Sequence, residues 1–120
     1  MVKPNKKRIR KLVAALRSGK YRQTRGRLKG KRGYCCLGVA CEISKLGEFD
    51  EVGSYVTGLS WRDCSTETLP DSVIEYYGFV NSCPVLKTRT GKESDAVSMN
   101  DGGHNNFYDI ADAFERTYLD

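Results

Sequence analysis

Charge divides this chain into two blocks. Residues 1–33 carry fourteen of the twenty Lys and Arg residues and no Asp or Glu. Residues 34–120 carry the other six together with all fifteen acidic residues, so the net charge of +5 combines a block of +14 with a block of −9. Like charges at this density repel one another. The fold must therefore set the basic block against the chain's own acids or leave it facing an external polyanion.

Length and composition indicate a single domain over residues 1–120, with residues 1–33 as its basic helix and loop. The chain is 39% hydrophobic, which is enough for a modest core. No apolar run approaches the roughly 18 residues that span a bilayer, and no secretory signal follows the charged N-terminus. The five Cys residues are odd in number and lack C-x-x-C spacing, which favours free thiols and a cytoplasmic location.

Helical periodicity dominates the apolar pattern. We expect helices over residues 5–18, 36–46, 70–77 and 105–118. Short strands are expected at 55–57, 59–61 and 85–90, with a turn at Gly91–Lys92. The predicted fold class is α+β, with three or four helices packed on a small, mostly antiparallel sheet. The first turn of the first helix holds Lys6, Lys7 and Arg8, where the helix dipole disfavours cations, so a bound anion or nearby carboxylates are expected there.

Three short motifs carry a family resemblance. They are the block Tyr34-Cys35-Cys36-Leu37-Gly38-Val39-Ala40-Cys41, the pair Leu69-Pro70, and Asn100-Asp101 ahead of the last helix. With the Leu-Arg-Ser-Gly at residues 16–19, these motifs resemble a set of small proteins encoded by tailed bacteriophages and prophages. The resemblance covers about residues 9–118 and implies a phage setting, a cytoplasmic bacterial host and a stand-alone domain. It implies no particular activity.

The basic third is the predicted ligand-binding region. A helix face and a glycine-punctuated loop supply cations at a density suited to a nucleic-acid backbone, and two flanking tyrosines could stack on bases. The alternative is a solvated face partly neutralised by the protein's own acids, such as Asp109, Asp112 and Glu115. The predicted binding residues are Lys7, Arg10, Lys11, Arg17, Tyr21, Arg22, Arg25, Arg27, Lys29, Lys31, Arg32 and Tyr34.

The cysteines admit three interpretations. Cys36 and Cys41 lie in an apolar run, where Cys acts as a small hydrophobe, and this interpretation is favoured. A zinc site is disfavoured because adjacent Cys residues cannot easily share one ion. A nucleophile at Cys35 or Cys36, near a helix N-terminus that lowers thiol pKa, would need His104 as its base. We therefore expect no catalytic residue, no metal and no cofactor.

The segment at residues 100–103 offers clustered oxygens within Asn-Asp-Gly-Gly. A cation site is one reading, but the carboxylate spacing of a calcium loop is absent, and a tight turn before the last helix is expected instead.

Two classes of function follow. The first is a non-enzymatic accessory protein that binds nucleic acid through phosphate contacts. The second is a phage effector against host defence, which either sequesters a small nucleotide signal or inhibits a host protein. A Cys/His thiol hydrolase is a lesser alternative. A nucleotide binder needs a compact pocket with a few Arg and an aromatic ring, whereas a backbone binder needs an open basic stripe.

Overall fold

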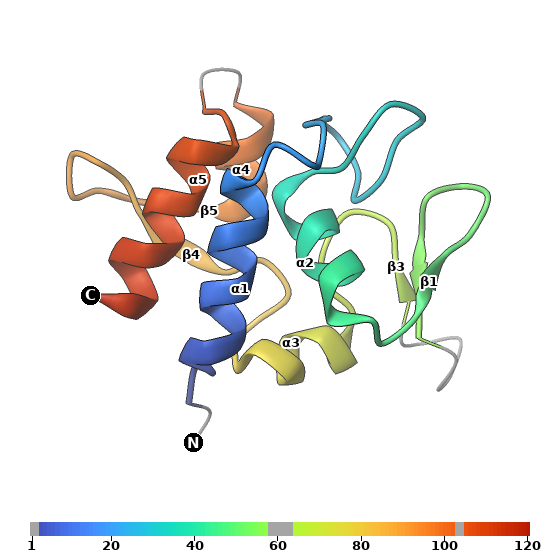
Figure 1. The fold of residues 1–120 in the computed structure, drawn as a ribbon, viewed down its shortest axis with the longest axis horizontal. Helices are drawn as coiled ribbons and strands as arrows, with labels where there is room; N and C mark the ends of the chain where they lie inside the picture. Colours follow the sequence, from blue (N-terminus) through green and yellow to red (C-terminus); the bar gives the residue numbers. More distant parts are fainter. Residues whose placement is uncertain (1–2, 58–63, 103–104) are drawn as a thin grey trace.

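Helix α1 (Lys6–Arg17) lies at the centre of the computed structural model, which describes residues 3–57, 64–102 and 105–120 (Figure 1). Its apolar stripe (Ile9, Leu12, Val13 and Leu16) is buried, as the spacing predicts. The Asn5 side chain caps the helix by accepting a hydrogen bond from the Arg8 amide at 3.1 Å. Helices α5, α2 and α3 all pack against α1.

Helix α2 (Cys36–Ser44) is buried along most of its length and ends at Lys45, which adopts a left-handed conformation with φ 58°. The helix therefore stops two residues earlier than the sequence predicts. Helix α3 (Asp71–Tyr77) begins directly after Pro70 and ends at Gly78, whose φ is +73°. The Tyr77 hydroxyl donates to the Ala40 carbonyl oxygen at 2.6 Å, which ties α3 to α2.

The last two helices follow one another closely. Helix α4 (Ala96–Asp101) is capped by Asp95, whose side chain accepts from the Ser98 amide at 2.7 Å. Helix α5 (Phe107–Phe114) begins with a reciprocal pair of hydrogen bonds between Asn106 and Asp109. It continues into a π-helical turn, η1 (Glu115–Leu119).

The strands form two small antiparallel sheets. Strands β1 (Glu48–Phe49), β2 (Tyr55–Val56) and β3 (Cys64–Ser65) make one sheet beside α2. Strands β4 (Val85–Lys87) and β5 (Glu93–Asp95) make a hairpin beside α5 (Figure 1). The strand predicted at 85–90 ends at Lys87, because the chain turns at residues 88–91, where the Gly91 amide donates to the Thr88 carbonyl at 3.0 Å. The turn expected at Gly91–Lys92 therefore begins three residues earlier. The predicted strand at 59–61 lies outside the described residues.

The α+β class is confirmed, with two differences from the sequence expectation. Five α-helices are present in the described residues instead of three or four, and the strands divide into two sheets at the edges of a helical core. The radius of gyration is 13.1 Å, close to the ~13.6 Å expected for one compact domain of this length. Among the described residues, no helix is long and apolar enough to cross a membrane.

Candidate nucleic-acid interface

The basic loop (residues 20–33) joins α1 to α2 and is held by backbone hydrogen bonds instead of regular structure. The Thr24 amide donates to the Tyr34 carbonyl at 2.8 Å, and the Tyr34 amide donates to the Arg22 carbonyl at 2.8 Å. Leu28 inserts its fully buried side chain into the core, and its amide donates to the Thr66 carbonyl at 2.6 Å. The backbone of this loop is therefore fixed although it contains no helix or strand.

Asn100 is the main side-chain anchor of the loop. Its side chain is fully buried, and its Oδ1 accepts from the Gln23 Nε2 and from the Cys36 amide, both at 3.1 Å. Its Nδ2 donates to the Thr24 carbonyl at 2.8 Å and to Asp101 Oδ1 at 3.0 Å. One amide side chain thus connects the loop, the start of α2 and the end of α4.

Asp101 extends this anchor. Its Oδ1 also accepts from the Gly26 amide at 3.1 Å, and the Arg25 Nε donates to the Asn100 carbonyl at 3.1 Å. The sequence prediction of a tight turn at residues 100–103 was wrong for its first half, because Asn100 and Asp101 form the last residues of α4. The overlooked signal was the helix cap at Asp95 followed by Ala96, Met99 and Asn100 at helical spacing.

Two glycines allow close backbone approaches, one within the loop and one between the loop and α2. A Cβ at Gly33 would overlap the Arg22 carbonyl, and a Cβ at Gly38 would overlap the Leu28 carbonyl. Gly38 lies within α2, so the glycine of the Cys-Cys-Leu-Gly block is needed where the loop crosses the helix. The sequence motifs at residues 34–41 and 100–101 therefore meet at the base of the basic loop.

Most of the predicted cations are exposed. Lys7, Arg10 and Lys11, the helix cations, lie on the solvent side of α1. All of the predicted cations on the basic loop are exposed except Lys29, which is half-buried. These loop cations are Arg22, Arg25, Arg27, Lys29, Lys31 and Arg32. The loop lies at the end of the molecule where α1 terminates (Figure 1).

Three loop cations also make internal contacts. Besides the Arg25 bond to Asn100, Arg27 donates to the Val52 carbonyl at 3.3 Å, and the Lys29 ammonium lies 5.3 Å from the Tyr34 ring centroid. Arg22, Lys31 and Arg32 make no side-chain hydrogen bond or ion pair with any described residue. These three exposed side chains therefore contribute charge to the surface that no described ion pair neutralises.

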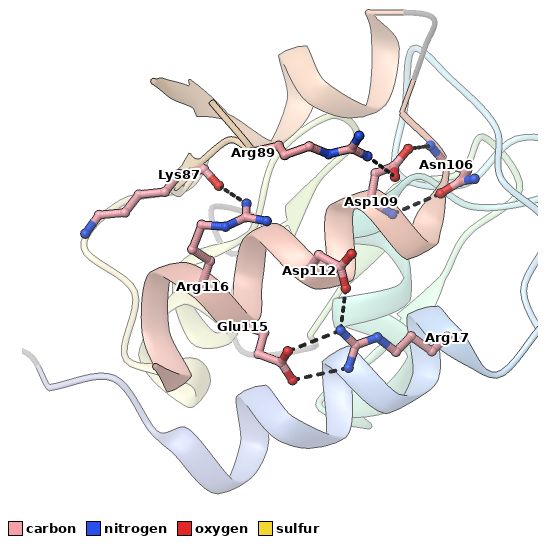
Figure 2. A network of polar contacts seen from close by, with 8 residues as sticks. All are labelled: Arg17, Lys87, Arg89, Asn106, Asp109, Asp112, Glu115 and Arg116. Carbon is pink, nitrogen blue, oxygen red and sulfur yellow. Dashed lines mark hydrogen bonds and ion pairs between the residues drawn. The ribbon is translucent and has the colours of Figure 1, made fainter. Parts of the chain in front are cut away.

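Arg17 has a different environment from the other predicted binding residues. Figure 2 shows its guanidinium between two carboxylates of the last helix, donating to Asp112 and, at 3.2 Å, to Glu115. These hydrogen bonds raise the pKa of Arg17. The structure therefore places Arg17 in a contact between α1 and the C-terminal helix, and its cationic head is already neutralised. Asp109 instead faces Arg89, at 3.7 Å.

The cations at the start of α1 are relieved in part by uncharged groups. Arg8 donates to the Tyr76 carbonyl at 2.8 Å, and its guanidinium lies 4.0 Å from the centroid of the Tyr76 ring. The sequence predicts a carboxylate or a bound anion near Lys6, Lys7 and Arg8. Among the described residues, no carboxylate forms an ion pair with these three cations.

Tyr21 and Tyr34 are half-buried members of an aromatic cluster. Their ring centroids lie 5.4 Å apart in an edge-to-face arrangement, and Tyr34 also meets Phe49 edge-to-face at 5.8 Å. Burial raises the pKa of the Tyr21 hydroxyl. The structure thus brings both tyrosines to the base of the loop, where their rings pack against protein.

All three cysteines of the motif are buried. Cys36 and Cys41 are fully buried, which confirms the core interpretation, and the Cys35 Sγ caps α2 by accepting from the Gly38 amide at 3.3 Å. The expected lowering of thiol pKa at this helix start was wrong, because burial raises the pKa of Cys35 to about 11 and raises that of Cys36 as well. The proposed base His104 lies outside the described residues. In the described ranges, no three His, Cys, Asp or Glu residues cluster as metal ligands.

Two pockets adjoin the basic loop, and both carry carboxylates. One, of about 280 Å³, includes Arg27 and Cys35 together with Glu67 and Asp101. The other, of about 310 Å³, sets Arg27, Lys29 and Lys31 against Asp50 and Glu51. Carboxylates on the wall of a pocket oppose binding of a compact polyanion inside it.

Comparison with known proteins gives a family but no function. Residues 5–118 match a family described as a domain of unknown function, DUF8296. The chain belongs to this family. The matched segment contains the basic loop, both anchoring motifs and all five helices of the DUF8296 domain described here. No curated protein and no solved structure matches the chain.

Proposed function

We propose that this DUF8296 protein is a non-enzymatic accessory protein that binds nucleic acid through phosphate contacts made by the basic loop. The observation that carries this proposal is that the exposed loop cations lie on a backbone held in place by hydrogen bonds to the rest of the domain. A binding surface of this kind loses little conformational entropy when the ligand arrives.

The charge layout supports the proposal. Arg17 is the one member of the basic block that forms an ion pair with a described carboxylate, and both of its partners lie in the C-terminal helical segment. The cations of the basic loop form no ion pair with a described carboxylate, so they keep their mutual repulsion, which a polyanion would relieve. Phosphate contacts of this kind release counterions and supply affinity without reading sequence.

A small nucleotide signal is a weaker candidate ligand. Its capture would need a compact pocket lined by Arg and an accessible aromatic ring. Both pockets beside the loop include acidic residues, and Tyr21 and Tyr34 pack against protein. These observations favour an extended ligand on the outer surface of the loop.

The setting is also proposed. The resemblance of the motifs to phage and prophage proteins supports a phage-encoded protein that acts in the cytoplasm of a bacterial host. Nucleic acid is abundant there, and free thiols such as those of Cys35, Cys36 and Cys41 remain reduced.

The experiment compares two triple variants that lose the same charge. Arg22→Gln, Lys31→Gln and Arg32→Gln together remove loop charge without removing a side-chain hydrogen bond or ion pair with a described residue. Lys45→Gln, Lys87→Gln and Lys92→Gln together remove the same charge from exposed positions outside the block. Fluorescence anisotropy with a labelled 20-bp duplex at ~50 mM salt is expected to show at least tenfold weaker binding for the loop variant. Equal binding by the two variants, or no binding by the wild type, would contradict the proposal.

A further inference from the structure

We infer that the ligand of the basic loop is double-stranded nucleic acid held by its phosphates, in preference to a single strand held by its bases. This inference rests on the proposed function and specifies the class of its ligand. It follows from three properties of the surface: the engagement of its aromatic rings, the rigidity of its backbone and the way its charge is presented.

The aromatic rings beside the loop are already occupied. Tyr34 packs edge-to-face with Tyr21 and Phe49, and the Lys29 ammonium lies 5.3 Å from its ring centroid. The Tyr34 backbone also carries two of the hydrogen bonds that fix the loop, so the residue cannot swing outward without releasing them. Proteins that hold single strands generally stack successive bases on open aromatic rings. Tyr21, the aromatic residue of the loop itself, is half-buried and engaged edge-to-face with Tyr34, so neither ring is freely open to a base.

One aromatic side chain in the described part of the chain is well exposed, and it lies beside acidic residues. Tyr108 is 57% exposed, but it belongs to α5, the helix that carries Asp109 and Asp112. Carboxylates beside a stacking ring repel the phosphates of the strand that would stack there. Tyr108 is therefore expected to lie outside the nucleic-acid interface.

Rigidity also favours a duplex. The loop backbone is tied to α2, α4 and the segment before α3 through Cys35, Asn100 and Thr66. A flexible single strand must itself be ordered to match a fixed array of cations, whereas a duplex already holds its phosphates in a regular array.

Charge density also favours a duplex over a single strand. Double-stranded DNA carries about one charge per 1.7 Å of its axis, and it gives a steeper salt dependence per contact than a single strand does. A surface that binds by charge alone therefore prefers the duplex. The helix cations Lys7, Arg10 and Lys11 add a second group of exposed charges on the same rigid domain.

The test measures binding of the full chain to three labelled ligands of 20 nucleotides or base pairs: duplex DNA, duplex RNA and poly(dT). The expected result is at least about tenfold tighter binding of a duplex than of poly(dT) at ~100 mM salt. The two duplex arms identify whether the preference is for DNA or RNA geometry. The variant Tyr108→Ala is expected to bind all three ligands as tightly as the wild type does.

The outcomes separate the inference from the proposal on which it rests. Binding of poly(dT) as tight as or tighter than that of both duplexes would overturn the inference and leave the proposed function standing. A loss of poly(dT) binding in Tyr108→Ala would overturn it in the same way and identify the stacking residue. If none of the three ligands binds, both the inference and the proposed function are overturned.

Discussion

Asn100 is the residue on which the geometry of the basic loop most depends. Its buried amide accepts two hydrogen bonds and donates two, to four different partners. Replacing Asn100 with Asp should destabilise the fold, because a carboxylate of the same shape can still accept both hydrogen bonds but can no longer donate the other two. It would also place a buried charge beside Asp101.

The substitution Asn100→Asp is accordingly expected to lower the free energy of unfolding at pH 7 by about 3 kcal/mol or more. Burial and Asp101 would raise the pKa of the new carboxyl in the folded state above its unfolded value. The penalty should therefore shrink as pH falls from 7 to 5 and the carboxyl becomes protonated. Urea unfolding at both pH values checks this, with Asn81→Asp on the exposed surface as control. A penalty that is small, or that grows as pH falls, would contradict the role of Asn100.

Single residues also show where sequence reasoning reaches its limit. The burial of Cys36 and Cys41 follows from their apolar neighbours and was predicted. The sequence suggested Asp112 and Glu115 as acids that could neutralise the basic block, and both do pair with it. It did not identify Arg17 as their partner, because these residues lie more than ninety positions apart and meet only when α1 packs on the last helix. The same reason hid Asn100, whose polar partners become apparent only in the folded structure.

The contact between the basic loop and α2 is the element-scale feature that positions the candidate interface. Gly38 faces the Leu28 carbonyl so closely that no Cβ fits between them. Within a helix, Ala is normally favoured over Gly by about 1 kcal/mol. Here the steric overlap should reverse that preference.

Gly38→Ala is therefore expected to destabilise the protein by about 1–3 kcal/mol, because the loop must move away from α2. It should also weaken duplex binding at temperatures where the protein is still folded. Gly30→Ala is the matched control, since its Cβ would meet only the Thr24 side chain, at 3.3 Å. Thermal unfolding of both variants provides the measurement. A stabilised Gly38→Ala protein would show that the loop does not depend on this crossing.

Elements with a continuous apolar stripe were predictable, and elements defined by other contacts were not. The spacing predicted α1 and α5 well because four or more apolar residues repeat along each helix. Helix α4 is only six residues long, and its sequence ends in a pattern typical of turns. The π-helical turn after α5 coincides with contacts to β4, where Arg116 donates to the Lys87 carbonyl at 2.7 Å (Figure 2).

At the scale of the whole molecule, the fold divides the basic block between two roles. Arg17 joins the block to the acidic last helix, and Arg8 is satisfied by Tyr76. The helix cations and most of the loop cations face solvent. The question raised by the charge division of the sequence thus has a physical answer for the described residues: the protein's own acids neutralise little of the block through direct ion pairs.

The measurement that tests this account most directly is the salt dependence of duplex binding. If about five phosphates are neutralised, a plot of log K against log salt concentration should have a slope of about −4.5 for the wild type. The variant with Arg22, Lys31 and Arg32 changed to Gln should have a slope shallower by about 2.7, because three phosphate contacts are lost. The control variant with Lys45, Lys87 and Lys92 changed to Gln should keep the wild-type slope. Equal slopes for all three proteins would contradict the claim that the basic loop binds phosphates.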